Sequence, residues 1–449
     1  MEETSVQAHI HEWIESRQFG RLKEALNEMD TYELVSLLAD LHDMRELGVA
    51  FRMLPTDRAV EVLGELEHDQ REELLTTLSS NTVAEILNEM PPDNRTELLE
   101  ELPGRVAQKL VNQLTGEERK IAMSLLAYPE DSIGRLMTPE YVAVRQHWTI
   151  EQVLRQIRRI AASRETCNVI YVVDGNWKLL DEIYLEDIVL AEPEQEVSDL
   201  MDGQCTYLVA TDDQEDAVEA FKKYDALALP VVDTKKTLVG IVTFDDVMDV
   251  QEEESTEDMQ RMAGMAPFEE SYLSASYGQM LRKRLPWLTV LMVVETLAVL
   301  VLSGYERMLA MFVMFMPLIN ATAGNTGNQV ASLMIRGFAV AEIHPQDWWR
   351  VFLREVARGL TMGVVLAGLG ALIVSFFGRE PNIALAVGLA VLSAVLLANL
   401  LGAMLPFVFR RVGVDPAVTS GPFIACLMDV GSILIFFSIA SGILHIVGS

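Results

Sequence analysis

One acidic residue stands inside a long apolar run at the C-terminal end of the chain. The stretch 416–449 contains a single formally charged residue, Asp429. If a membrane-crossing helix begins near Ser420, Asp429 lies about 14 Å deep, at ~1.5 Å per residue. A carboxylate at that depth costs at least ~2.5–3.5 kcal/mol unless it faces water, a cation or a partner group. We therefore predict that Asp429 is a cation ligand in an ion pathway; Glu295, in the apolar stretch 286–305, supports the same argument more weakly.

A second polar concentration follows Pro317 in another apolar run. Segment 320–329 reads Asn-Ala-Thr-Ala-Gly-Asn-Thr-Gly-Asn-Gln and contains Gly324, Asn325 and Asn328. Glycines and amides inside a membrane need a neighbouring helix or a water-filled cavity to satisfy them. Oxygen ligands suit hard ions such as Mg2+ and Ca2+. We expect neither a thiol nor an imidazole beside these oxygens, so selection of a soft metal is not expected.

The elements that must position these residues are membrane helices. Five nearly uncharged stretches are each long enough to cross about 30 Å of hydrocarbon as a helix. They are 286–305, 308–335, 359–378, 381–409 and 416–449. If the spans alternate, nine Lys and Arg residues fall on one side and two on the other, which predicts a cytoplasmic N-terminus and an extracytoplasmic C-terminus. The polar, acidic first 18 residues predict no cleavable signal peptide.

The rest of the chain is strongly acidic. The formal net charge is -31, and residues 286–449 contribute nothing to it, because they hold eight acids and eight bases. A charge of this sign repels nucleic acid and attracts cations, so we expect no nucleic-acid partner. The three cysteines form no CxxC motif and the seven histidines form no cluster, which excludes a disulfide scaffold or a structural zinc site.

Two internal repeats divide the acidic part. Between residues 54 and 126, a Leu or Met followed by turn or capping residues recurs every twelve positions, which predicts short helices of about eight residues stacked into a small right-angled solenoid. From about residue 136 to 250, two copies each read strand, helix, strand, turn, strand, helix, and they resemble a tandem pair of CBS domains. CBS pairs generally dimerise and often bind adenine nucleotides. A very acidic helix is predicted at 245–262, with several carboxylates on one face.

Two membrane motifs bring the chain close to a known family. The Ala-Gly-Asn-Thr-Gly-Asn-Gln core of segment 317–336 and the segment 402–430 closely resemble the MgtE magnesium channels, and the order of modules matches over essentially the whole chain. The resemblance implies an all-α cytoplasmic helical-repeat domain, an α/β tandem CBS pair and a five-helix transmembrane domain, in a homodimer with ten spans. The expected boundaries are 1–130 for the helical repeats, 131–250 for the CBS pair, 251–284 for the acidic connecting (plug) helix and 285–449 for the transmembrane domain.

The resemblance also implies which residues meet the ion. In the pathway these are Asp429, Asn325 with the neighbouring Gly324 and Asn328, and Asp415 at the cytoplasmic mouth of the last span. The regulatory, Mg2+-binding carboxylates fall on Glu61, Asp93, Glu97, Glu215, Asp225, Asp246, Asp249, Glu254, Glu257 and Asp258.

A nucleotide contact falls on Asp187, which predicts an ATP site at the CBS pair, although its neighbour Glu186 is an acid where a base would suit phosphate better. A threonine often precedes the pore acid in the family, and here Cys426-Leu427-Met428 stands in its place. Glu295 matches no family motif.

These features predict a Mg2+ channel for uptake in the bacterial plasma (inner) membrane, surrounded by lipid. Scarce cytoplasmic Mg2+ leaves the carboxylates to repel one another, and abundant Mg2+ bridges them and closes the pore. The alternative is a secondary carrier that exchanges Mn2+ or Co2+ for H+ or Na+, with Asp429 or Glu295 as the coupling acid. We do not expect an enzyme, because Asp429 lacks a partner base, a nucleophile elbow or a set of metal-binding histidines.

Overall fold

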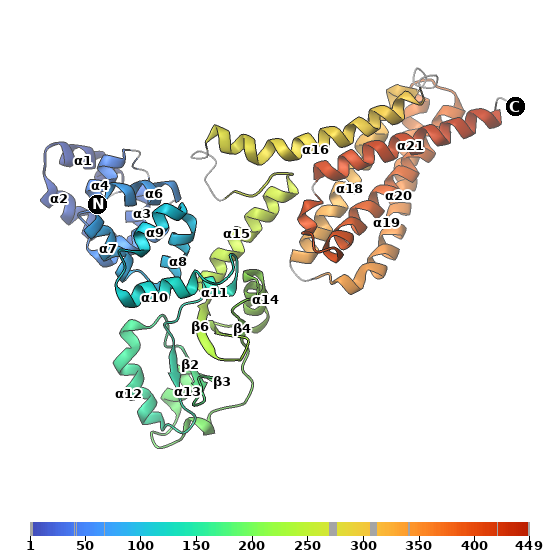
Figure 1. The fold of residues 1–449 in the computed structure, drawn as a ribbon. Coiled ribbons are helices and arrows are strands. Elements are labelled where there is room, and N and C mark those ends of the chain that lie inside the picture. Colours follow the sequence, from blue (N-terminus) through green and yellow to red (C-terminus); the bar gives the residue numbers. More distant parts are fainter. Residues whose placement is uncertain are drawn as a thin grey trace. The chain divides into compact units, whose positions relative to one another are not determined.

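The computed structural model describes residues 3–39, 41, 43–66, 68–268, 276–305, 312–339, 342–419 and 421–447. The chain divides into two compact units. The first comprises Met1–Glu252 with Glu270–Ser274, and the second comprises Glu253–Glu269 with Ala275–Ser449. Each unit is described by itself, and Figure 1 labels their elements.

The first half of unit one is a stack of short helices. Their bounds are α1 (Glu3–Glu15), α2 (Phe19–Glu28), α3 (Thr31–Ala39), α4 (Met44–Phe51), α5 (Thr56–Glu65), α6 (His68–Thr77), α7 (Ser80–Glu89), α8 (Pro92–Glu101), α9 (Gly104–Val111) and α10 (Gly116–Leu125). From α5 to α10 each helix begins twelve residues after the previous one, so the predicted repeat is confirmed. The helices are eight to ten residues long, slightly longer than expected.

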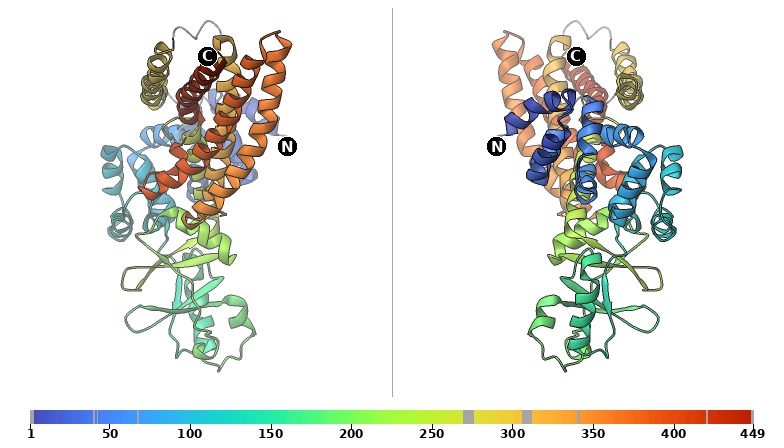
Figure 2. Two further views of the ribbon diagram at one scale, coloured as in Figure 1. Left: turned by 90° about the vertical axis from the view of Figure 1, so that its right-hand side faces the viewer. Right: turned by 90° about the vertical axis from the view of Figure 1, so that its left-hand side faces the viewer.

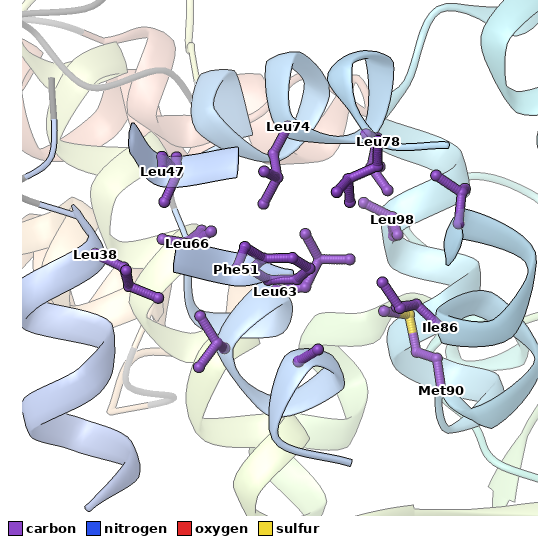
Figure 3. Packing of buried hydrophobic residues seen from close by; sticks show 14 of the residues in the cluster. Leu38, Leu47, Phe51, Leu63, Leu66, Leu74, Leu78, Ile86, Met90 and Leu98 are labelled. Carbon is purple, nitrogen blue, oxygen red and sulfur yellow. The ribbon is translucent and has the colours of Figure 1, made fainter. Parts of the chain in front are cut away.

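In three of the repeats the recurring Leu or Met is the residue that ends the helix, and its side chain enters the core. Leu66, Met90 and Leu102 are the C-caps of α5, α7 and α8, each in an extended conformation and each buried. Extended backbone stops the helix, while the apolar side chain is removed from water. In Figure 3 the side chains of Leu66, Met90, Phe51 and Leu63 share one core with those of the neighbouring repeats.

The second half of unit one contains two matching β-α-β-β-α modules. The first holds β1 (Val142–Val144), α12 (Ile150–Ile160), β2 (Val169–Val173), β3 (Leu179–Tyr184) and α13 (Leu185–Leu190), and the second holds β4 (Leu208–Val209), α14 (Gln214–Tyr224), β5 (Ala228–Val232), β6 (Leu238–Thr243) and the start of α15 (Phe244–Met262). The residues of α15 from Glu253 onward belong to unit two. A short helix, α11 (Ile133–Leu136), precedes them. In both sheets the first strand pairs parallel with the second, and the second pairs antiparallel with the third. The predicted repeat is therefore confirmed.

The two modules differ where the sequence of the first lacks a glycine. Gly240 pairs with Val231, and a Cβ at Gly240 would lie 2.7 Å from Sδ of Met137. At the matching position of the first module, Asp181 pairs with Val172, is fully buried, and accepts a 2.9 Å hydrogen bond from Gly203 N–H. Asp181, which stands where the second module has Gly240, thus forms a hydrogen bond that links the first module to the turn at Gly203, before the second module.

Unit two is a bundle of long helices. They are α16 (Tyr277–Ser303), α18 (Met316–Ala339), α19 (Trp348–Phe376), α20 (Pro381–Arg411) and α21 (Gly421–Val447). Within the described residues, four stretches are long and apolar enough to cross a membrane: Tyr277–Ser303, Pro345–Phe376, Pro381–Arg411 and Gly421–Ile443. The remaining long helix, α18, carries the polar run 320–329, and the first residues of the predicted span 308–335 lie outside the described residues. The acidic helix predicted at 245–262 is confirmed as α15 (Phe244–Met262). The wider segment 251–284, expected as the connecting helix, also contains a turn at Gly264, which has a φ of +76°, and the start of α16.

The bundle is built around α20, which packs against α18, α19 and α21, while α16 packs on α21 (Figure 2). Small residues allow this close packing: a Cβ at Gly402 of α20 would lie 2.5 Å from the carbonyl oxygen of Gly327 in α18. Between α19 and α20, the fully buried Asn399 donates a 3.1 Å hydrogen bond to the buried Glu355. The arrangement places α18 and α21, which carry the predicted pathway residues, directly against each other.

Candidate functional site

Asp429 lies in a polar cluster between α18 and α21. It is half-buried, and its carboxylate is hydrogen-bonded to the side chain of Asn320. Ser432 Oγ donates to Oδ1 of Asn320 at 2.7 Å, which leaves the Nδ2 group of Asn320 to donate to Asp429. No base pairs with Asp429 among the described residues. A half-exposed carboxylate held by one amide retains oxygen lone pairs that can face a cation.

The polar run holds α18 against α21 through its glycines. Asn320, Gly324 and Gly327 stand four and three residues apart, so they share one face of α18. The Gly324 Cβ position is 3.9 Å from Cα of Ala425, and a Cβ at Gly327 would lie 2.6 Å from Ile424. A side chain at Gly327 would therefore force the Ile424 side chain of α21 to move. Asn320 was not among the predicted site residues, although its spacing from the two glycines could have indicated it.

The other predicted pathway residues of α18 lie away from Asp429. Asn325 is exposed, and five residues of helix place it about 140° around the axis from Asn320. Asn328 is half-buried beside Gly421 at the start of α21, where the distance from the Gly421 Cβ position to Cγ of Asn328 is 3.6 Å. Its buried Oδ1 accepts no hydrogen bond from the described residues.

A thiol lies beside the cluster, so the expectation of none was wrong. Cys426 precedes Asp429 by one helical turn, and its side chain is hydrogen-bonded to Glu295 of α16. The Glu295 carboxylate is also close enough to Asp429 to act on it electrostatically. Cys426 was noted only as a departure from the family motif and not as a site residue, even though residues three apart share a helix face. The cluster therefore combines two carboxylates, an amide, a hydroxyl and a thiol from α16, α18 and α21.

A second group, the entrance cluster, consists of Glu257, Asp258 and Arg261 of α15 and Asp415. Asp415 is the N-cap of a short 3-10 helix before α21, and its Oδ1 accepts a 2.8 Å hydrogen bond from Ala417 N–H. Arg261 donates to both Asp415 and Glu257. Burial, and next the charge of Asp415, raise the pKa of Asp258 to about 6. Three predicted metal ligands are thus collected around one guanidinium.

A third group, the interface cluster, lies in unit one and joins α8 to the CBS-like modules. It consists of Asp93 of α8, Asp246 of α15 and Glu165. Burial, followed by the charges of Asp246 and Glu165, raises the pKa of Asp93 to about 8. Burial also raises the pKa of Asp246 to about 7, although the hydroxyl and N–H of Thr243 donate to its carboxylate. Glu165 was not predicted, and no spacing in the sequence indicated it.

The remaining predicted regulatory carboxylates are dispersed. Glu61 is exposed and accepts a 2.9 Å hydrogen bond from Thr31, and the exposed Glu97 pairs with Arg71 at 3.6 Å. Glu215, Asp225 and Asp249 are also exposed, while Glu254 is half-buried and acts on Asp258. Within the described residues no three His, Cys, Asp or Glu side chains are arranged to hold a metal ion. One chain by itself therefore places no complete ligand set among those residues.

The predicted nucleotide contact does not fit phosphate well. Asp187 and Glu186 are both exposed acids in the first turn of α13. Two carboxylates repel a polyphosphate, and neither residue is paired with a base in the described ion pairs. We therefore derive no step through ATP.

Family models and known proteins match this chain over nearly its whole length. A model described as "Divalent cation transporter" (MgtE) matches residues 316–439, the MgtE intracellular N domain matches 29–131, and the CBS domain matches 133–194 and 197–253. The predicted CBS pair and N-terminal helical domain are thereby confirmed.

Two curated relatives cover almost the entire chain. The magnesium transporter MgtE of Thermus thermophilus is 38% identical over 443 residues, which are 95% of this chain and 98% of the relative. The magnesium transporter MgtE of Bacillus subtilis is 30% identical over 432 residues, 94% of each chain.

Two solved structures resemble slightly more than half of the chain. One is the cytosolic domain of the Mg2+ channel MgtE in complex with ATP, at 36% identity and a TM-score of 0.52, covering 54% of this chain and 99% of that one. The other is the soluble part of a magnesium transporter, at 27% identity and the same TM-score, covering 57% of this chain and 100% of that one.

Proposed function

The chain belongs to the MgtE family of divalent cation transporters, and we propose that it is a Mg2+ channel for uptake whose pore closes when cytoplasmic Mg2+ binds its acidic domains. The observation that carries the proposal is Asp429, a carboxylate in an apolar helix that is held by an amide and lacks a basic partner among the described residues. A carboxylate in that position is tolerated when water or a cation is beside it. The relatives are named as magnesium transporters, which fits transport rather than catalysis.

In this proposal the pore is formed by two copies of the chain. α18 serves as the fifth span beside the four apolar helices, giving ten spans in a homodimer. Asn325 and the apolar residues Met292, Val293 and Val299 of α16 are exposed in a single chain, so they are available to the partner or to lipid. Mg2+ dehydrates reluctantly, so an Asp429 from each copy would hold it through its water shell. Inward flow needs no ATP, because a divalent ion gains ~4.6 kcal/mol per 100 mV.

Gating rests on the interface and entrance clusters. In this proposal the protein lies in the plasma membrane of a bacterium, with its N-terminus in the cytoplasm and its C-terminus outside the cell membrane. Burial and neighbouring acids raise the pKa of Asp93 and Asp246 in the interface cluster and of Asp258 in the entrance cluster, so each is costly to ionise, and a bound divalent cation lowers that cost. Unit charges 4 Å apart cost between about 1 and 4 kcal/mol, so several pairs supply the ~5.5 kcal/mol that moves a gate from 1:99 to 99:1.

Each of the other predicted regulatory ligands would bind Mg2+ together with further groups that come close to it only in the closed state. These ligands are Glu61, Glu97, Glu215, Asp225, Asp249 and Glu254. ATP at Asp187 stays a prediction, which calorimetry with ATP on the full chain and on Asp187→Ala would test.

The direct test of the pore is Asp429→Ala. We expect Mg2+ flux into liposomes to fall to background while the purified protein keeps the size of the wild-type dimer. Glu342→Gln, an exposed acid of the same unit outside the cluster, is the matched control and should retain wild-type flux. Wild-type flux through Asp429→Ala would refute the pore role.

A further inference from the structure

The end of α15 carries one basic residue among many acids. Of its nineteen residues, eight are Asp or Glu, and Arg261 is the single Lys or Arg. Arg261 stands in the last turn, where a cation also interacts favourably with the carbonyl end of the helix. Arg261 was not predicted as a functional residue, because the function predicted for this segment depends on its carboxylates.

Arg261 connects two separate elements of unit two. Its Nη1 donates to Oδ2 of Asp415 and its Nη2 to Oε1 of Glu257. The three side chains are only 34%, 31% and 27% exposed, so these ion pairs are partly shielded from water. Since Ala417 N–H occupies Oδ1 of Asp415, both oxygens of that carboxylate accept a hydrogen bond.

The chain that follows Arg261 is also packed against the membrane helices. Gln260 makes two hydrogen bonds with the backbone of Phe268, at 3.1 and 2.8 Å. Lys283 of α16 donates to the carbonyl of Pro267 at 2.6 Å. A Cβ at Gly264 would lie 2.7 Å from the Trp287 ring of α16. The last turn of α15 is therefore held at the start of α21 by Arg261 and at the start of α16 by the following turn.

The charges of the entrance cluster do not balance. When ionised, Glu257, Asp258 and Asp415 carry three negative charges against the single positive charge of Arg261. The excess is at least two negative charges, and the nearby Glu254 adds another, so the cluster attracts a divalent cation.

We propose that Arg261 is a positioning residue of the gate: it tethers the end of α15 to Asp415 at the entrance of the last membrane helix, so that Mg2+ bound at the entrance cluster closes the pore. This inference rests on the proposed function, since it assigns the regulatory ion a partner within the chain. Without Arg261 the end of α15 loses its ion pair with Asp415, so the closed arrangement is less stable and more Mg2+ is needed to hold it.

The test is Mg2+ flux through the full-length protein in liposomes, with Mg2+ set on the cytoplasmic side. Arg261→Gln should raise the Mg2+ concentration of half-closure about three- to tenfold, the effect of losing one partly exposed charged pair. Arg261→Lys keeps the charge and should restore closure to within about threefold of the wild type. The control Arg155→Gln removes an exposed pair with Glu151 on α12 and should change nothing.

A second readout does not depend on transport. Hydrogen exchange of the amides at 258–262 is measured in Mg2+-free buffer, where Arg261→Gln should speed exchange severalfold and Arg155→Gln should not. If the wild type closes with Mg2+ but Arg261→Gln has the same half-closure and exchange, the tether is overturned and the proposed function stands. If the wild type never closes, the proposed gating fails, and the exchange rates alone decide whether Arg261 holds α15.

Discussion

At the scale of single residues, Asp93 is a carboxylate that the fold places where its charge is unfavourable. It is 7% exposed, and its pKa is raised to about 8 by burial and by Asp246 and Glu165. An acid whose pKa is higher in the folded than in the unfolded state stabilises the fold below its unfolded pKa. That stability is lost as the pH rises through the folded value. Between about pH 4 and 8 the wild type should therefore lose stability at this site.

Asp93→Asn removes this pH dependence. At pH 8 we expect the variant to unfold at a higher temperature than the wild type, because its free energy of unfolding is larger by an amount on the order of 1–3 kcal/mol. This difference should shrink toward pH 5. Added Mg2+ should stabilise the wild type at pH 8 more than the variant. Thermal unfolding of the full chain measures both effects, and Glu85→Gln, an exposed acid of α7, is the control. A constant difference between variant and wild type at every pH would contradict this account of Asp93.

The site could be predicted in part, because some of its residues are exceptional in their local sequence. Asp429 is conspicuous in an apolar run, and Asn320 could have been inferred from its spacing with Gly324 and Gly327. Glu165 and Arg261 could not, since their partners, Asp93 and Asp415, are 72 and 154 residues away and only tertiary packing brings them together. The position of Glu295 beside Asp429 could not be predicted either, because it depends on the packing of α16 on α21.

At the scale of elements, the contact of α18 with α20 depends on the absence of a side chain at Gly402. A Cβ there would lie 2.5 Å from a backbone oxygen of Gly327, which cannot move without moving α18. We expect Gly402→Ala to destabilise the helical domain by ~1–3 kcal/mol through overpacking and to reduce flux, because α18 also carries Asn320. Gly368→Ala in α19, where a Cβ meets nothing within 4 Å, should be neutral or slightly stabilising.

Unfolding in detergent and flux in liposomes would measure both variants. Equal stability of Gly402→Ala and the wild type would show that the helices can separate at no cost.

The sequence could predict the elements well where one residue type ends each repeat, as in α5 to α10. It could not reveal the buried Glu355–Asn399 contact, because nothing local distinguishes Asn399 in an apolar helix as the partner of Glu355.

At the scale of the whole molecule, the proposal links distant carboxylates to one pore. Neutralising Asp246, Asp249, Glu254, Glu257 and Asp258 together should leave the channel open at Mg2+ concentrations that close the wild type, since the predicted Mg2+ ligands of α15 are then uncharged. The control neutralises five exposed acids elsewhere in the CBS pair, namely Glu192, Glu194, Glu196, Asp199 and Glu219. Normal closure of the first variant in patch recordings would count against the gating role of these residues.

The measurement that tests the central claim most directly is a patch recording of the wild-type protein with Mg2+ as the charge carrier. At low cytoplasmic Mg2+ we predict discrete unitary currents, and at high cytoplasmic Mg2+ on the same patch their reversible disappearance. Transport of Mg2+ without unitary currents would instead indicate a carrier, and currents that persist unchanged at high Mg2+ would contradict the gate.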